Sequence, residues 1–131
     1  MTFPALTAEE TDLGVISLRT EAVQAYREAV GDTSKVSADA VPPTGLAAWC
    51  LARLIERMGL PAGTLHGTQE IESLRAVRPG DEVRCGAKLG GRSQRGGWEF
   101  TTVDFTLRDR SGETVLCGRS MVMQRMPGKE A

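Results

Sequence analysis

Near the start of the chain, the hydrophobic pattern predicts one amphipathic helix. Val23, Tyr26 and Val30 recur at helical spacing, and the run stops at Gly31. Thr20 precedes these positions, and threonine is a residue that caps helices well. We therefore expect a short helix between Thr20 and Gly31.

The segment 45–58 is apolar around nearly the whole circumference of a helix. Its three charged residues gather near one edge, at the C-terminal end. Thr44 is a suitable cap before the segment, and Gly59 is a typical residue for its end. A helix that is apolar on almost all sides must be surrounded rather than laid on a surface. We therefore expect this helix at the centre of the fold.

The rest of the chain has the pattern of strands. Apolar and polar residues alternate in 82–89 and again in 98–107, as in half-buried strands. We expect a short strand at 14–18, a glycine-rich connection at 90–97, and four long strands at 65–77, 82–89, 98–107 and 114–124. Short turns between four consecutive strands favour an antiparallel meander. Long twisted strands can curl around one helix, so we expect an α+β hot-dog fold, a long antiparallel sheet wrapped around one central apolar helix.

The composition is that of an average soluble domain, with 40% hydrophobic and 25% charged residues, which excludes a disordered chain. The 131 residues fit a single domain over 1–131, with tails at 1–13 and 126–131. The net charge of −1 gives no electrostatic case for binding nucleic acid or an acidic membrane. No apolar run is long enough to span a bilayer, and the N-terminus lacks an apolar signal core. We expect a cytoplasmic protein.

The chain has three cysteines and one histidine, without the spacing of a metal site. Cys50, Cys85 and Cys117 each lie in an apolar stretch, which predicts buried, reduced thiols. No histidine lies near Cys50 in sequence, so packing is favoured over a nucleophilic role. We expect neither a metal nor a cofactor.

The order of these elements, together with three motifs, resembles the MaoC-like hydratase and dehydratase family, most closely the N-terminal hot-dog halves of double-hot-dog dehydratases. The motifs are the loop GDTSKVSADA, the helix entry PPTGL and the strand HGTQEIESLRAVRPGDEV, within a resemblance that covers roughly 14–124. It implies an enzyme that adds water to, or removes it from, acyl groups on coenzyme A or acyl carrier protein, in fatty-acid or polyketide metabolism. It also implies a tunnel where two hot-dog units join, in a homodimer or in a heterodimer with a related chain.

The resemblance also implies where the chemistry lies. Asp32 matches the family's aspartate, while Ser37 stands where the family has a histidine. Hydration of an enoyl thioester needs a group that takes a proton from water, a group that supplies a proton at Cα, and an N–H that polarises the thioester oxygen. A serine hydroxyl is a poor base, so Asp32 is the stronger catalytic candidate. The alternatives are a loop residue that caps backbone groups for Asp32 and a solvated loop residue for Ser37.

His66 is the third catalytic candidate, because it is the only imidazole of the chain. It would replace the missing base if its strand and the Asp32 loop met at one tunnel. A structural histidine bonded to the backbone is the favoured alternative. The candidate substrate-binding residues are Thr44 and Gly45 at the helix start, Trp49 on the helix and Gly67 beside His66.

The pattern also offers less favoured hypotheses about two arginines and three aromatic residues. Arg92 and Arg95 would meet a phosphate of coenzyme A or of a carrier arm, although a solvated hairpin tip is favoured. Trp98, Phe100 and Phe105 would line an acyl tunnel, although packing in the core or on the sheet is favoured.

Two classes of function remain. The first is an acyl-thioester hydratase or dehydratase with a degenerate Asp/His motif, or a lyase or cyclase derived from it that acts on a polyketide-like substrate. The second is a non-catalytic acyl-binding subunit of a heterodimeric dehydratase. A thioesterase is disfavoured, because Glu56 is the only acid of the central helix and lies near its exposed end. In both classes the ligand is an acyl thioester or a related small molecule.

Overall fold

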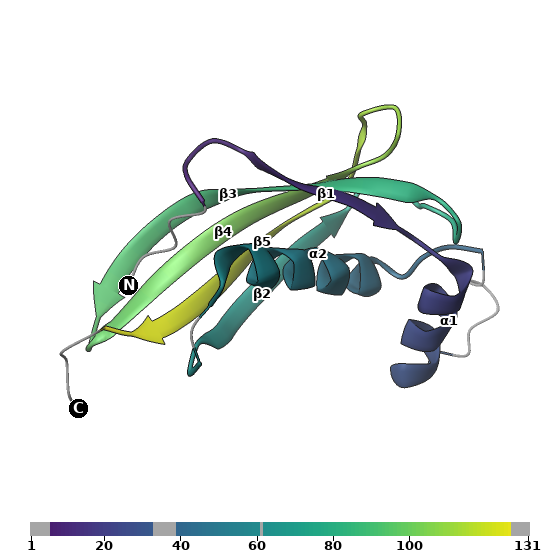
Figure 1. Cartoon of the computed structure of the whole chain (residues 1–131). Coiled ribbons are helices and arrows are strands. Elements are labelled where there is room, and N and C mark those ends of the chain that lie inside the picture. The colour runs from purple at the N-terminus through teal and green to yellow at the C-terminus, as the bar shows by residue number, and fades with distance from the viewer. Residues whose placement is uncertain (1–5, 33–38, 61, 127–131) are drawn as a thin grey trace.

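A long helix lies against one face of a five-stranded antiparallel sheet (Figure 1). The computed structural model describes residues 6–32, 39–60 and 62–126. Its elements are β1 (Thr11–Ser17), α1 (Thr20–Ala29), α2 (Pro43–Met58), β2 (Leu65–Ser73), β3 (Glu82–Arg95), β4 (Trp98–Arg108) and β5 (Thr114–Arg125). The sheet curves over α2, and α1 lies beyond the N-terminal end of α2. The expected helix within a long antiparallel sheet is confirmed.

The strands lie in the order β1-β3-β4-β5-β2. β3, β4 and β5 form a meander, but β2 pairs with β5 and not with β3. The prediction of a four-strand meander is wrong because β1 occupies the free side of β3. β1 begins at Thr11, inside the stretch expected to be a tail. β2 consequently forms one edge of the sheet.

Both predicted helix caps are wrong, while the predicted end of the long helix is confirmed. Thr20 and Thr44 lie inside α1 and α2, and neither helix has a side-chain cap bond. Pro43 opens α2, at a position where its missing N–H removes no helical hydrogen bond. Gly59 ends α2 in a left-handed conformation (φ 58°, ψ 49°), and its N–H donates to the Ile55 carbonyl.

The core lies between α2 and the inner face of the sheet. Alternate residues of β4 point to this face and are almost completely buried, as the alternation in the sequence predicts; they include Val103, Phe105 and Leu107. The buried side of α2 meets them with Leu46, Cys50 and Leu54.

A disulfide joins α2 to the sheet. Cys50 of α2 is bonded to Cys85 of β3, with their Cα atoms 6.3 Å apart. The prediction of reduced thiols is therefore wrong for these two residues, because packing the helix on the sheet brings their side chains together. Cys117 is a free cysteine and is partly exposed.

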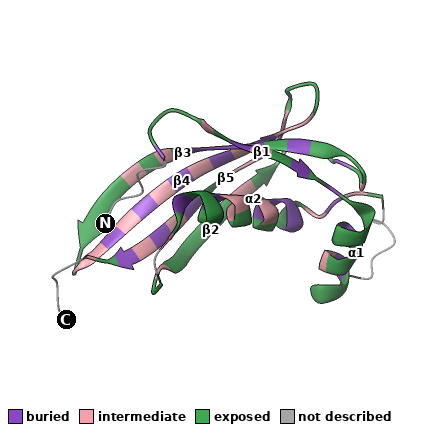
Figure 2. Cartoon of the chain, in the orientation of Figure 1, coloured by how far each residue is buried: buried purple, intermediate pink, exposed green. Residues whose placement is uncertain are grey.

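One flank of α2 is uncovered, so the expectation of a fully surrounded helix is wrong for a single chain. Ile55 is 45% exposed, Ala48 and Ala52 are exposed, and Leu51 is half-buried. In Figure 2 the ribbon of α2 carries exposed and intermediate colours beside its buried stretches. The apolar circumference of the helix therefore exceeds what this chain alone covers.

The glycine-rich stretch 90–97 is mostly strand. β3 continues to Arg95, and Gly96 and Gly97 form the turn with positive φ values of 60° and 84°. A two-residue turn of this kind matches the twist of a hairpin and needs residues that tolerate positive φ. The expected long connection is wrong because cross-strand pairing with β4 continues to Arg95 and Trp98.

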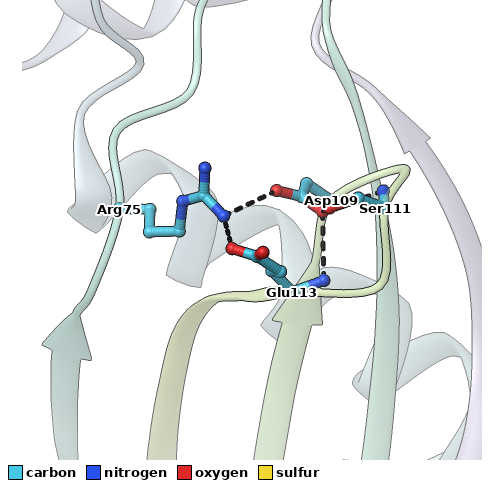
Figure 3. Close-up of polar contacts among 4 residues, drawn as sticks. All are labelled: Arg75, Asp109, Ser111 and Glu113. Atoms are coloured by element: carbon cyan, nitrogen blue, oxygen red, sulfur yellow. Dashed lines mark hydrogen bonds and ion pairs between the residues drawn. The ribbon is translucent and has the colours of Figure 1, made fainter.

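Ion pairs hold the segment that follows β2 (Figure 3). Arg75 forms ion pairs with Glu113 and with Asp109, 3.5 Å from Nη1 to Oδ2, both in the turn between β4 and β5. The Val77 carbonyl then accepts a hydrogen bond of 2.8 Å from the Val41 N–H, just before α2. These contacts tie the segment after β2 to the turn between β4 and β5 and to the residues just before α2.

Candidate functional site

Asp32 lies directly after α1 and is held by Arg27. The Asp32 N–H donates to the Arg27 carbonyl at 2.8 Å, and Oδ2 of Asp32 lies 3.4 Å from Nε of Arg27. The side chains of Arg27 and Asp32 are 9% and 25% exposed. This contact fixes the carboxylate close to the C-terminal end of α1. Ser37, the other candidate of this loop, lies outside the described residues.

The start of α2 is covered by the ring of Tyr26 from α1. The Tyr26 hydroxyl donates to Oγ1 of Thr44 at 2.8 Å. A Cβ at Gly45 would lie 3.2 Å from two ring carbons, so glycine allows the ring to approach closely. The ring centroid of Trp49 lies 5.8 Å from that of Tyr26. Three of the predicted substrate-binding residues, Thr44, Gly45 and Trp49, therefore surround one tyrosine.

Tyr26 and Arg27 are the residues of this site that the sequence did not single out. The spacing of Tyr26 with Val23 and Val30 indicated only a core position. The signal available for Arg27 was a basic residue in the last turn of a helix, followed by Asp32. Neither contact follows from local pattern, since each depends on how α1 meets the next segment.

The structure separates His66 from Asp32. His66 lies at the beginning of β2, after the C-terminal end of α2, whereas Asp32 lies before its N-terminal end (Figure 1). With 16 residues, α2 is about 24 Å long. His66 and Asp32 therefore do not meet within one chain. A Cβ at Gly67 would lie 2.7 Å from Cε of Met121, which supports a packing role for Gly67.

The other predicted residues do not gather around one tunnel. Phe105 points into the core, while Trp98 and Phe100 alternate with buried residues and lie on the outer face of the sheet. Arg92 and Arg95 are exposed on β3. The three aromatic side chains are thus divided between the two faces of β4.

The inner face of the sheet also carries buried polar residues. Glu99, Thr101, Ser120 and Gln124 are each at most 8% exposed. Nε2 of Gln124 donates to Oε1 of Glu99 at 3.5 Å, while the hydroxyls of Thr101 and Ser120 have no hydrogen-bond partner among the described residues. Thr101 lies in the same row of cross-strand pairs as His66. Buried hydroxyls without a partner are uncommon in folded proteins.

Among the described residues, no cluster of three or more His, Cys, Asp and Glu residues is arranged to hold a metal. In the same part of the chain, no helix is long and apolar enough to cross a membrane.

A hollow of about 510 Å³ on the outer face is lined by residues that include Glu72, Asp104, Cys117 and Arg119. Burial, and secondly Glu72, raises the pKa of the Cys117 thiol, which disfavours a reactive thiolate there. This hollow lies on the face of the sheet away from α2.

Comparison with known proteins shows to which family this chain belongs. Residues 5–117 match the family model described as FAS1-like, dehydratase domain region. The chain belongs to this dehydratase family. No curated protein matches the sequence significantly. The family match agrees with the MaoC-like resemblance of its motifs.

Solved structures similar to this dehydratase-family chain establish its hot-dog fold. The monoamine oxidase regulatory protein of Archaeoglobus fulgidus has a TM-score of 0.82 at 12% identity, with 96% of this chain and 95% of that chain covered. The HadBC (3R-hydroxyacyl-ACP dehydratase) complex of Mycobacterium tuberculosis has a TM-score of 0.71 at 15% identity, with 91% and 97% covered. A MaoC-like dehydratase has a TM-score of 0.74 at 22% identity, with 96% of this chain and 44% of that chain covered.

Proposed function

We propose that this chain is a hydratase or dehydratase of the MaoC-like type. Its substrate is an acyl group held as a thioester on coenzyme A or acyl carrier protein, in fatty-acid or polyketide metabolism of the cytoplasm. In the hydration direction, the oxygen of water bonds to Cβ of an enoyl thioester and a proton is added at Cα. Dehydration is the reverse, and water and protons alone balance the reaction.

The observation that carries this proposal is the position of Asp32. It matches the family's aspartate in the motif, and Arg27 holds it directly after α1. Asp32 precedes α2 in the chain, so the end of α2 that follows Asp32 is its first turn. The partial positive charge of a helix N-terminus favours the negative charge that develops on a thioester oxygen. Asp32 is suited to take the proton of water as the oxygen bonds to Cβ.

A second candidate is a non-catalytic acyl-binding subunit of a heterodimeric dehydratase. The ion pair between Asp32 and Arg27 favours it, because a carboxylate engaged by a largely buried arginine can serve structure alone. In this case a related hot-dog chain with an intact Asp/His pair supplies the chemistry. The HadBC dehydratase of similar fold is itself described as a complex.

Hydration of a 2-enoyl-CoA by the purified chain, followed as the loss of enoyl absorbance, tests the proposal. Asp32→Asn should lower kcat at least about a hundredfold, the usual contribution of a general acid or base. Asp104→Asn is the matched control, because it removes a carboxylate that is also paired with an arginine, Arg119 at 2.7 Å, but on the outer face. The control should keep the wild-type rate.

Two outcomes would change the assignment. Full activity in Asp32→Asn would contradict a catalytic role for this carboxylate. Turnover that appears only when a related chain with an intact Asp/His pair is added would support the second candidate.

A further inference from the structure

The first turn of α2 keeps few N–H groups free for a ligand. Pro42 and Pro43 have none, because proline lacks a backbone N–H. The N–H groups of Gly45 and Leu46 both donate to the Pro42 carbonyl, at 2.9 and 3.1 Å. The Thr44 N–H has no acceptor among the described residues. The backbone donor that this turn offers is therefore the N–H of Thr44.

The hydroxyl of Thr44 is a second available donor. Its oxygen accepts the hydrogen bond from the Tyr26 hydroxyl at 2.8 Å, so its own hydrogen is not used in that contact. Within the part of the chain that the structure describes, this side chain makes no other hydrogen bond. Thr44 is exposed, so a ligand can reach this hydrogen. One residue thus offers both an N–H and an O–H on the first turn of α2.

The ring of Tyr26 is held against α2 by packing. A Cβ at Gly45 would lie 3.2 Å from two ring carbons, so the ring lies directly on the backbone of the helix at this glycine. The Trp49 ring, one turn further along α2, is tilted by 59° against it, with 5.8 Å between centroids. Tilted aromatic pairs at such separations are favourable. These contacts fix the position from which the Tyr26 hydroxyl donates to Thr44.

Neighbouring residues of α1 hold Thr44 and Asp32. Tyr26 donates to Thr44, and Arg27, the next residue, forms the ion pair with Asp32 at 3.4 Å. Both residues belong to the last turns of α1, and consecutive Cα atoms are about 3.8 Å apart. α1 therefore links the two donors of Thr44 to the carboxylate of the proposed site.

We propose that the hydroxyl and the N–H of Thr44 together bind the thioester oxygen of the substrate, and that Tyr26 is the positioning residue that holds this hydroxyl. The inference rests on the proposed function, which puts the thioester at the first turn of α2. Negative charge develops on the thioester oxygen when water bonds to Cβ, and donors that are fixed in advance stabilise it without reorganising. Neither donor gives up its proton, so the balance of the hydration is unchanged.

The contact with Tyr26 restricts the side chain of Thr44. A threonine side chain has three staggered rotamers. Only a rotamer that keeps Oγ1 within reach of the Tyr26 hydroxyl retains the hydrogen bond of 2.8 Å. Tyr26 thus acts on the substrate through the Thr44 hydroxyl, and its hydroxyl should matter only while that of Thr44 is present.

The carbonyl stretching frequency of a bound thioester reports the donors on its oxygen without any turnover. Butyryl-CoA labelled with ¹³C at the thioester carbonyl is the probe, because it lacks the double bond that hydration needs. Hydrogen bonds to the oxygen lower the frequency, because they weaken the C=O bond. Binding to the wild type should lower it, binding to Thr44→Val should lower it less, and Tyr26→Phe should give an intermediate value.

Thr106→Val is the matched control for this measurement. Thr106 is a half-buried threonine of β4 that lines the opposite face of the sheet from α2, so its loss should leave the frequency at the wild-type value. Equal frequencies in the wild type and Thr44→Val would overturn the inference. Failure of the wild type to bind butyryl-CoA would overturn it as well.

The rate of 2-enoyl-CoA hydration distinguishes positioning from a purely structural role of Tyr26. Thr44→Val should lower kcat about a hundredfold, a common loss for one donor to an oxyanion, while Thr44→Ser should keep most of the rate. Tyr26→Phe, which keeps the ring, should lower kcat about tenfold. The double variant should be no slower than Thr44→Val, because Tyr26 acts through the missing hydroxyl. The same tenfold loss in both backgrounds, or full activity of Thr44→Val, would overturn the inference.

These two readouts separate this inference from the proposed function. A wild type that hydrates no enoyl thioester, but lowers the carbonyl frequency through Thr44, would contradict the hydratase and support the inference. A wild type that is active, but whose bound carbonyl is unaffected by Thr44→Val, would support the proposed function and overturn the inference.

Discussion

Oδ2 of Asp32 lies 3.4 Å from Nε of Arg27, and the arginine side chain is only 9% exposed. The pair joins the last turn of α1 to Asp32 just after it, so one contact serves both the fold and the proposed site. Because Arg27 is largely removed from water, losing its partner costs more than losing the partner of a surface charge.

The contribution of this pair to stability is measurable. Arg27→Met keeps the apolar packing of the stem but removes the charge, and it should lower the free energy of unfolding by about 1–2 kcal/mol. Arg19→Met is the control, because the pair of Arg19 with Glu21 at 4.0 Å is exposed on both sides, and its loss should change stability by less than about 0.5 kcal/mol. Urea unfolding monitored by circular dichroism provides both values. Equal effects at the two positions would contradict a structural role for Arg27.

Neighbouring residues of α2 should respond differently to the same substitution. Leu54 is 1% exposed and Ile55 is 45% exposed. Leu54→Asp should abolish cooperative unfolding, because an unpaired buried charge costs several kcal/mol. Ile55→Asp should still melt cooperatively, since its side chain reaches solvent in the single chain. Thermal melts of the two variants provide the comparison, and a cooperatively folded Leu54→Asp variant would be incompatible with the placement of α2.

The disulfide predicts a definite number of free thiols. Protein denatured without reductant should expose one reactive thiol, that of Cys117, and three after reduction. Cys50 and Cys85 are 35 residues apart, so reduction should lower stability by about 3–4 kcal/mol in the chain-entropy model. Titration with a thiol reagent decides the count. Three reactive thiols before reduction would show that Cys50 and Cys85 are not bonded.

Asp109 should make the fold sensitive to acid. Hydrogen bonds from Ser111 lower the pKa of its carboxyl below the ordinary value, with a further contribution from Arg75 (Figure 3). A group whose pKa is lower in the folded state stabilises the fold above its unfolded pKa and loses that effect as the pH falls through the folded pKa. Asp109→Asn should therefore weaken the dependence of stability on pH below about pH 4. Urea unfolding at several acidic pH values measures this, and identical slopes for the variant and the wild type would refute it.

The sequence predicted those parts of the fold that depend on local pattern. Alternation placed Val103, Phe105 and Leu107 on one buried face, and Gly59 was correctly identified as the end of α2. The partner of β2 was not predictable in this way, because β2 pairs with β5 only as a consequence of β1 pairing with β3. Strand order is decided by such long-range contacts, which leave no periodic signal.

The same distinction holds for the site. The motif predicted Asp32 as a candidate, and this stays a prediction, but the contacts of Arg27 and Tyr26 depend on how α1 meets the following segments. The sequence also left open whether His66 approaches Asp32. That question is decided by the length and direction of α2, because Asp32 precedes one end of this helix and His66 follows the other.

The mass of the wild-type chain in solution tests most directly the expectation, implied by the family resemblance, that two hot-dog units join in a homodimer. Light scattering should give about 28 kDa, twice the 14.1 kDa of one chain. Ile55→Asp, which places a charge on the uncovered flank of α2, should shift the mass toward that of one chain. A wild type that scatters as a single chain of 14.1 kDa at micromolar concentration would contradict the account.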